Sequence, residues 1–555
     1  MARILSSKRT IVLDGASGTH IKTQYPDLGS EEVSVRDPEL VYNIHKDYLD
    51  VGARIILTNT FGVNLKHYSK PKAKTLIRSS VRIAKRVVKK RGLTAGDIGP
   101  SGELPEPLGD KKLESLISDF KFIARTLATA GVDILYLESF TSLIEARAAV
   151  IAARDLKRPV FVTLTFDDSL RTPFGDLPES CLLVLEGLGA QAVGVNCTTP
   201  EITIAVLKKM RSVSSIPLIA KPNAGIPAGD HFTYNTRKMA SFIPELTRVA
   251  DLVGGCCGTT PDFIRMVSRK RRMRKRDIRR KPLILAVPQR TVRLDHTTVV
   301  GERINPTGRR RLTQALKKKD YDYIVREAKE QEDFGAEAID VNLFVPLLNE
   351  KNSMVNVVRR LVSRITVPIF IDTRDYDAAI AGLTIFPGIC AINSVPVIKK
   401  ELRRWLPLAQ RFGAYVVVSL CSKTLPKTAG DRMRLYRQAK QIARGLRFPT
   451  DHLIYDPLVF PIATAPDQIG ETLETVSLLK RAGELSILGI SNISYGLPDR
   501  STINGALTAN AIRAGATFII ANPFDEKVKD AVIGSRILFE GKIVKRKIIA
   551  RPDTL

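Results

Sequence analysis

Short runs of apolar residues, rich in valine and isoleucine, recur along the first half of the chain, with longer mixed stretches between them. Runs of this length that are apolar throughout are typical of parallel strands buried on both faces. Eight such runs alternating with helix-length segments predict a closed (β/α)8 barrel. The runs cover residues 10–15, 53–61, 95–100, 132–140, 159–166, 190–197, 217–225 and 251–257.

The second half of the chain repeats this pattern. Eight further runs cover residues 297–305, 336–342, 367–373, 389–395, 415–420, 453–460, 485–492 and 516–524. The expected fold class is therefore α/β, with two (β/α)8 TIM barrels in tandem joined by a basic linker. We expect the first barrel at 1–267, the linker at 268–295 and the second barrel at 296–555. After Pro523 the pattern predicts a final helix and then a basic, strand-like segment at 542–550.

Composition is that of an ordinary globular protein. Of the 555 residues, 44% are hydrophobic and 26% are charged, which is enough apolar side chain for large cores. There is no stretch of 18 apolar residues that would predict a transmembrane helix, and the first residues lack the apolar core of a signal peptide. We therefore expect a cytoplasmic protein without a membrane partner. Six cysteines are too few for a disulfide framework and fit free thiols or metal ligands.

The formal net charge of +29 raises the question of an anionic partner. It is spread along the chain, apart from a dense run at residues 269–281 that holds ten lysines or arginines. No zinc-finger spacing, helix-turn-helix signal or aromatic RNA-binding motif accompanies this run. We interpret it as a solvated linker and expect no nucleic acid partner. An anionic cofactor or an acidic partner protein is equally compatible with the charge.

Polar residues stand at or just beyond the carboxyl end of each run in the first barrel. Singly, Asn and Asp at such places are most often turn residues. Their coincidence at all eight ends is what a (β/α)8 active site requires, because that edge of the barrel holds the catalytic groups. The residues are Asp14, Thr58, Asn59, Asp97, Glu138, Asp167, Cys197, Asn223, Cys256 and Cys257.

Three of these residues are cysteines. Cys256 and Cys257 follow the eighth run and Cys197 ends the sixth, so the thiols flank the seventh strand at the barrel mouth. Three thiolates suit a zinc ion that keeps one coordination position open for a substrate. The alternative, ordinary buried cysteines, is the better interpretation for a single thiol, whereas an adjacent pair with a matching third favours a metal.

The second barrel has carboxylates and carboxamides at its strand ends and no cysteine cluster. Such groups suit the edge of a flat heterocycle with alternating donors and acceptors, for example a guanine-like or pterin-like ring. Arg500 could bind a carboxylate tail bidentately. The residues at the strand ends are Glu302, Asn305, Asp340, Asn342, Asp372, Asn393, Asp456, Asn492 and Asn522.

These motifs together resemble the N-terminal half of cobalamin-dependent methionine synthase. The first barrel is similar to a homocysteine S-methyltransferase domain through DGASGTH, LTNTFG, GDIGPSGELPEPLG, LESF, GVNC, PNAG and GGCCGTTP. The second is similar to the methyltetrahydrofolate-binding domain through GERINPTGR, GAEAIDVN, INSV, YDPLVFP, GISNISYGLPDRS and NPFDE. GGCCGTTP and GERINPTGR are the most specific of these, and the resemblance covers nearly the whole chain.

The resemblance implies roles for individual residues. The three cysteines match the zinc ligands, and Asp14, Glu138 and Asn223 match positions that hold the amino-acid end of homocysteine or shape its pocket. Asn492 matches a group near the pterin N5 and, with the ring-anchoring Asp340 and Asp456, forms the expected catalytic set. The folate-binding positions, including two lining residues, are Glu302, Asn305, Asp340, Asp375, Asn393, Asp456, Asn492, Arg500 and Asn522.

Two residues depart from the family pattern. Asp375, three positions after Asp372, stands where related pterin domains often carry Asn, so the pterin could be a modified one such as a methanopterin. Lys221, two positions before Asn223, places a cation near the homocysteine mouth.

A third departure is that the family continues into a cobalamin-binding domain and an adenosylmethionine-binding reactivation domain. No histidine here lies in the Asp-x-His-x-x-Gly motif of the former. We therefore expect cobalamin to be supplied in trans, by a separate corrinoid-binding protein or free in solution, together with a reactivation partner.

The resemblance thus implies a methyltransferase of methionine synthesis. It would pass a methyl group from methyltetrahydrofolate, or a related methylpterin, by way of cobalamin to zinc-activated homocysteine. Two alternatives stay open. One is a homocysteine methyltransferase fused to a methylenetetrahydrofolate reductase-like barrel, and the other is a pterin- or RNA-binding scaffold without catalysis.

Overall fold

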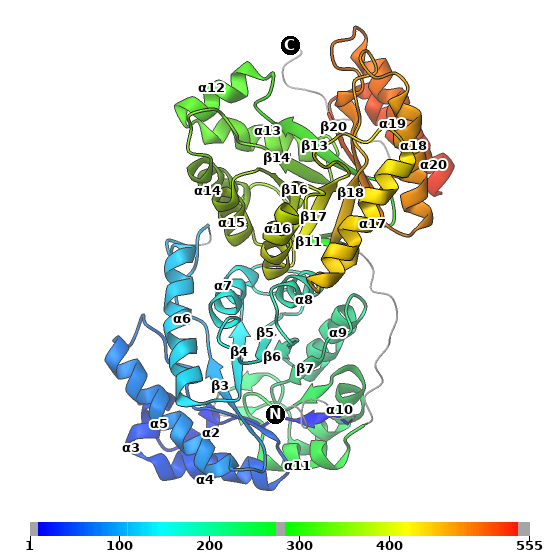
Figure 1. Cartoon of the computed structure of the whole chain (residues 1–555). Helices are drawn as coiled ribbons and strands as arrows, with labels where there is room; N and C mark the ends of the chain where they lie inside the picture. Colours follow the sequence, from blue (N-terminus) through cyan, green and yellow to red (C-terminus); the bar gives the residue numbers. More distant parts are fainter. Residues whose placement is uncertain (1–8, 108, 230, 273–283, 542–555) are drawn as a thin grey trace. The chain divides into compact units, whose positions relative to one another are not determined.

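The chain folds into two compact units, residues 1–281 and 282–555, each described here by itself (Figure 1). The computed structural model describes residues 9–107, 109–229, 231–272 and 284–541. Most of the basic run at 269–281 and the expected strand-like segment at 542–550 lie outside these residues. No helix among the described residues is long and apolar enough to cross a membrane.

The first unit is an eight-stranded parallel barrel. Its strands lie in the order β1-β10-β7-β6-β5-β4-β3-β2, and a parallel bridge between Leu13 and Ile55 joins the two ends of the sheet. Each strand overlaps one of the predicted apolar runs, and only β3 begins before its run, by two residues. They are β1 (Ile11–Val12), β2 (Ile55–Leu57), β3 (Leu93–Ile98), β4 (Ile134–Phe140), β5 (Val160–Leu164), β6 (Ala192–Asn196), β7 (Leu218–Lys221) and β10 (Leu252–Val253).

Helices between the strands cover the outside of this barrel, because most of them carry an apolar stripe that the sheet buries. Several begin with a proline in the first turn, where its missing N–H costs nothing. The main helices are α4 (Pro38–Asp50), α5 (Lys70–Val88), α6 (Leu113–Ala130), α7 (Leu143–Ala153), α8 (Pro178–Gly187), α9 (Pro200–Arg211), α10 (Thr236–Val249) and α11 (Pro261–Arg269). Short elements occupy the loops beyond β1 and β7, namely α2 (Gly18–Lys22), η1 (Ser30–Glu32), α3 (Val33–Arg36), β8 (Pro227–Ala228) and β9 (His231–Phe232).

The second unit is a closed barrel of eight parallel strands in sequence order. The strands are β13 (Thr298–Ile304), β14 (Ala338–Val341), β15 (Ile369–Asp372), β16 (Ala391–Pro396), β17 (Tyr415–Ser419), β18 (Leu453–Asp456), β19 (Leu485–Gly489) and β20 (Phe518–Ala521). Each of them overlaps a predicted run, and only β16 extends past its run, by one residue, so two TIM barrels in tandem are confirmed.

The helices of the second unit surround its strands (Figure 1). They are α12 (Arg310–Lys318), α13 (Tyr321–Asp333), α14 (Glu350–Leu361), α15 (Tyr376–Ile385), α16 (Lys399–Phe412), α17 (Ala429–Gly445), α18 (Gln468–Arg481), α19 (Arg500–Ala514) and α20 (Glu526–Glu540), with the short turns η2 (Thr450–His452) and η3 (Ile490–Asn492). The final helix expected after Pro523 is α20.

Part of the span expected as linker has regular structure. Residues 284–293 form an antiparallel hairpin of β11 (Ile284–Val287) and β12 (Arg290–Arg293). Its four apolar residues 284–287 are buried, and the amide of Ile389, just before β16, donates to the carbonyl of Ala286 at 2.7 Å. The hairpin therefore packs at the amino ends of the strands, opposite the mouth. A four-residue apolar run is buried only when a tertiary partner covers it, which local sequence does not reveal.

Candidate functional site

The three cysteines meet at the mouth of the first barrel. Cys197 directly follows β6, and Cys256 and Cys257 follow β10. Their sulfur atoms all lie within 4.8 Å of one another, with 4.0 Å between those of Cys256 and Cys257. Hydrogen bonds with the other two thiols lower the pKa of Cys197 to about 3. Three sulfurs that converge in this way fit a zinc ion with a fourth position left for a substrate.

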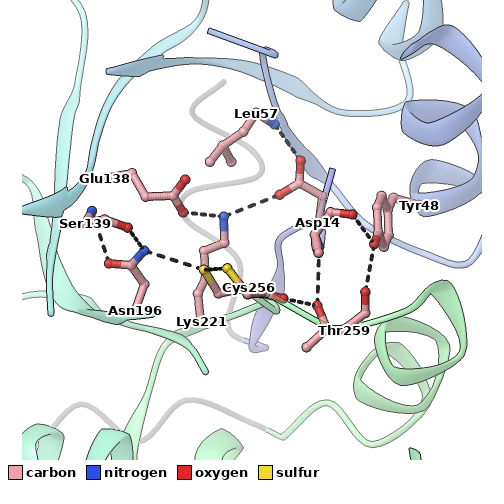
Figure 2. A network of polar contacts seen from close by, with 11 residues as sticks. Asp14, Tyr48, Leu57, Glu138, Ser139, Asn196, Lys221, Cys256 and Thr259 are labelled. Carbon is pink, nitrogen blue, oxygen red and sulfur yellow. Dashed lines mark hydrogen bonds and ion pairs between the residues drawn. The ribbon is translucent and has the colours of Figure 1, made fainter. Parts of the chain in front are cut away.

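A polar network holds the loop that carries Cys256 (Figure 2). Asn196 Nδ2 lies 3.8 Å from Cys256 Sγ, and its amide also contacts Ser139 through both the hydroxyl and the backbone N–H. On the other side, the Thr259 hydroxyl donates to the Cys256 carbonyl at 2.7 Å. The buried Tyr48 hydroxyl lies 3.2 Å from the Thr259 carbonyl. Such supporting contacts orient metal ligands.

Charged side chains at the ends of four other strands line the same mouth, three of which Figure 2 shows. Lys221, the last residue of β7, donates to Glu138 Oε1 at 2.7 Å and forms a longer ion pair with Asp14 Oδ1 at 3.7 Å. The other oxygen of Asp14 accepts from the Leu57 amide at 2.7 Å. Asp97, at the end of β3, shares a hydrogen bond with Glu138. All four charged groups are buried.

Burial dominates the electrostatics of this cluster. It raises the pKa of Asp14 to about 7, against the opposing charge of Lys221, and it raises the pKa of Glu138 and Asp97 as well. For Lys221, burial lowers the pKa, but the charges of Glu138 and Asp14 outweigh it and leave the pKa above its ordinary value. Lys221 therefore stays protonated.

The cysteines and the charged cluster line one cavity of about 280 Å³, and the Gly15–Thr19 loop closes one side of it. This volume suits a small amino acid. Asn223 lies on the other side of Cys197, where the two residues line a second cavity of about 540 Å³ together with the exposed Asp167. The first barrel thus brings Asp14 and Glu138 to the thiols as expected, whereas Asn223 borders the site from a neighbouring cavity.

At the mouth of the second barrel, carboxylates alternate with carboxamides. Asn393 Nδ2 donates to Asp340 Oδ1 at 3.0 Å, and Asn342 Nδ2 donates to Asp372 Oδ2 at 2.9 Å. The two carboxyl groups also contact each other. Burial, aided by the neighbouring Asp372, raises the pKa of Asp340 well above its usual range. A pair of this kind holds one proton between two acids and so offers both a donor and an acceptor.

Two further carboxylates face this mouth. Glu302 accepts from the Ser491 hydroxyl at 2.8 Å and lies 3.7 Å from Arg309. Asp456 accepts from the Leu458 amide at 2.8 Å through Oδ1. Burial raises the pKa of Asp456 to about 6 and raises the pKa of Glu302.

Other expected folate contacts are engaged locally. Asp375 caps α15, accepting from the amides of residues 377 and 378 at 2.8 and 3.1 Å. Arg500 donates to the Ser494 hydroxyl at 3.0 Å and to the Ser491 carbonyl at 2.9 Å, so it holds the η3 loop.

The remaining carboxamides differ in exposure and contacts. Asn492 is exposed on the η3 loop. Asn305 and Asn522 are half-buried at strand ends and accept from the backbone amides of residues 307 and 524 within their own loops.

Several residues of these sites were not assigned roles from the sequence. For Asp97 and Asp372, the signal in the sequence is their position at the end of an apolar run. Asn196 and Ser139 precede and follow assigned residues and carried no signal of their own. Tyr48 lies on a helix, and nothing in its neighbourhood along the chain marks it.

The chain matches known families in both units. Residues 11–271 match the homocysteine S-methyltransferase family model, and residues 301–522 match the pterin binding enzyme model. The second match favours the pterin-binding interpretation over a reductase-like barrel. Methionine synthase of Mycobacterium tuberculosis is 28% identical over 564 residues, covering 92% of this chain and 47% of the relative. Methionine synthase of Mycobacterium leprae is 27% identical, with the same coverage of 92% and 47%. The chain thus spans about half the length of these relatives.

Among solved structures, the apo homocysteine methyltransferase MmuM of Escherichia coli is 26% identical and covers 48% of this chain and 98% of its own, with a TM-score of 0.41. Dihydropteroate synthase from Xanthomonas albilineans with 7,8-dihydropteroate is 16% identical and covers 46% of this chain and 98% of its own, with a TM-score of 0.36. By its family matches, the chain joins a homocysteine S-methyltransferase domain to a pterin-binding domain, as the N-terminal part of methionine synthase does.

Proposed function

We propose that this protein transfers a methyl group from a methylated reduced pterin, methyltetrahydrofolate or a related methylpterin, to the sulfur of homocysteine. A corrinoid, held on a separate protein or free in solution, carries the methyl group between the two barrels. The observation that carries this proposal is the convergence of three thiols on a small, charged cavity.

The first barrel contains what a thiol acceptor needs. Zinc held by the three cysteines would supply a Lewis-acid site that favours the thiolate of homocysteine, a group whose free pKa is near ~8.5. Asn196 and Thr259 hold Cys256 in place for this role. The charged cluster of Glu138 and Lys221 holds the amino-acid end of the substrate in the same cavity.

The second barrel supplies the groups for the methyl donor. Asp340 and Asp456 accept hydrogen bonds from the ring N–H and amino groups of the pterin. Asn492, on the η3 loop that Arg500 holds, stabilises the positive charge that N5 must carry when it loses its methyl group. The expected contact of Arg500 with the carboxylate tail remains part of the proposal.

Both mouths carry exposed apolar side chains on the loops that follow the strands. They are Phe61, Leu104 and Ile226 in the first unit and Phe344, Leu347, Leu425 and Tyr495 in the second. A docked carrier would cover apolar side chains at such a rim. Methyl transfer needs the reacting atoms at about 3 Å, so the carrier must contact the loops around each mouth. The exposed apolar side chains on these loops support a carrier larger than a small molecule.

The proposal is tested by two half-reactions with the zinc-supplemented full chain. Homocysteine with methylcobalamin reports on the first barrel, and methyltetrahydrofolate with cob(I)alamin reports on the second. The corrinoid spectrum follows both. We expect turnover in each mixture. A chain that binds zinc yet leaves methylcobalamin unchanged in the presence of homocysteine contradicts the proposal.

Cys256→Ala makes this test specific to the metal. Removing one of three sulfur ligands should lower zinc content from about one ion per chain to near zero and abolish homocysteine methylation, because the remaining two thiols do not hold the ion. Methyltetrahydrofolate binding should not change. Cys181→Ala, at a buried position on α8, is the matched control. Full zinc content in the Cys256 variant would refute the assignment of the ligands.

A further inference from the structure

Lys221 is a buried lysine whose hydrogen-bonding capacity is only partly used. An ammonium group has three donors. One of them reaches Glu138 at 2.7 Å, whereas the Asp14 oxygen at 3.7 Å is beyond hydrogen-bond distance. Among the described residues, no other acceptor is within reach, so two N–H groups stay without a partner. Buried donors in this state call for a further partner, which a water or a bound ligand can supply.

Two acceptors of the same charged cluster are also unsatisfied. Asp14 Oδ1 and Asp97 Oδ1 are buried and accept no hydrogen bond from the described residues. Both residues line the same cavity as Lys221 and the three cysteines. The cavity therefore presents spare donors and spare acceptors side by side.

An α-amino acid matches this arrangement because it is a zwitterion. Its ammonium group offers three donors to the free oxygens of Asp14 and Asp97. Its carboxylate needs donors, and Lys221 is the one cationic side chain among the described residues that line the cavity. Charge-assisted hydrogen bonds of this kind are the strong ones in proteins.

We propose that Lys221 binds the carboxylate of the thiol substrate and so makes the first barrel selective for amino-acid thiols over simple thiols. This inference rests on the proposed function and adds a residue and a substrate class to it. The Lys221 ammonium group lies between Glu138 and Asp14 in Figure 2. A carboxylate bound there would accept hydrogen bonds from the N–H groups of Lys221 that Glu138 does not use.

The alternative role for Lys221 is that of a counter-ion that keeps Glu138 and Asp14 ionised and oriented for the substrate ammonium. The two roles predict opposite patterns with truncated substrates. If Lys221 binds the carboxylate, its removal should not change kcat/KM for a thiol that lacks the carboxylate. If Lys221 only supports the acids, its removal should not change kcat/KM for a thiol that lacks the amine.

The experiment compares Lys221→Met with the wild-type chain on three thiols. These are homocysteine, 3-aminopropane-1-thiol, which lacks the carboxylate, and 4-mercaptobutanoate, which lacks the amine. Methylcobalamin is the methyl donor. Lys440→Met is the matched control, since Lys440 is a partly buried lysine of the second unit that is likewise paired with a carboxylate, Glu484.

We expect Lys221→Met to lower kcat/KM about 10- to 100-fold for homocysteine and 4-mercaptobutanoate. The value for 3-aminopropane-1-thiol should stay within about twofold. An equal loss on all three thiols, no loss on any, or a loss confined to the two amines overturns the inference. If the wild-type chain methylates no thiol, the proposed function fails and the binding measurement with metal-free protein decides on Lys221, so the two failures are distinguishable.

A binding measurement gives the same comparison without the metal. Calorimetric titration of metal-free protein with L-methionine and with 3-(methylthio)propylamine, its decarboxylated analogue, should show weaker binding of L-methionine alone in the variant. Equal weakening of both ligands overturns the inference. If Lys221→Met fails to fold because Glu138 is left unpaired, the double variant K221M/E138Q removes both charges and should keep the same pattern relative to E138Q.

Discussion

Asp456→Asn tests whether the negative charge of Asp456 contributes to pterin binding. In the structure Asp456 Oδ1 accepts from the Leu458 amide at 2.8 Å, and the carboxamide oxygen of Asn can accept the same bond. The substitution therefore removes the negative charge and leaves the local backbone contact. A hydrogen bond to a charged group is worth about 1.5–3 kcal/mol, so the Kd for methyltetrahydrofolate should rise about 10- to 100-fold at pH 8.

The pKa of this carboxyl sharpens the prediction. Burial raises the pKa of Asp456 to about 6, so the group is ionised at pH 8 and about 90% protonated one unit below its pKa. Wild-type affinity should therefore fall about tenfold, from its value at pH 8, as the pH drops to 5. The variant has no group to titrate there. The ratio of the two Kd values cancels any titration of the ligand itself.

The assay is calorimetric titration with methyltetrahydrofolate at several pH values between 5 and 8. Asp451→Asn, an exposed residue just before the amino end of the same strand, is the matched control. A wild-type to variant ratio that stays constant across this range would show that Asp456 does not act as a charged ligand. Equal affinities at pH 8 would remove it from the pterin site altogether.

Two further predictions concern the first barrel. Asn196→Ala should weaken zinc binding about 10- to 100-fold in a chelator competition, because the loop of Cys256 loses its contact with Asn196; unchanged affinity would mean that Thr259 alone holds that loop. The free energy of unfolding of the wild type should fall by about 3 kcal/mol between pH 6.5 and pH 4, and His45→Leu should remove this fall. The reason is that burial lowers the pKa of His45 from 6.5 to about 4. The unfolded imidazole takes up a proton below pH 6.5 and the folded one does not until about pH 4, so wild-type unfolding free energy falls through that window. Equal slopes for both proteins in denaturant titrations at stepped pH would contradict this.

The strand ends of both barrels could be predicted because they follow from local pattern. An apolar run followed by Asp, Asn or Cys marks the point where a buried strand leaves the core, and the (β/α)8 topology brings all such points to one edge. Asp14, Cys197 and Cys256 were found this way. The hairpin at 284–293 could not be, because its burial depends on contacts with residues about a hundred positions further along.

The chain by itself determined the fold class, the two barrels and the meeting of three thiols at one mouth, since these depend on periodicity and topology alone. Tertiary structure alone decided which charges pair. Lys221 contacts Glu138, 83 positions away, and Arg500 holds its own loop while Asp375 caps a helix. The physical reason is that a side chain's partner depends on barrel closure and packing, which set distances between residues that are far apart along the chain.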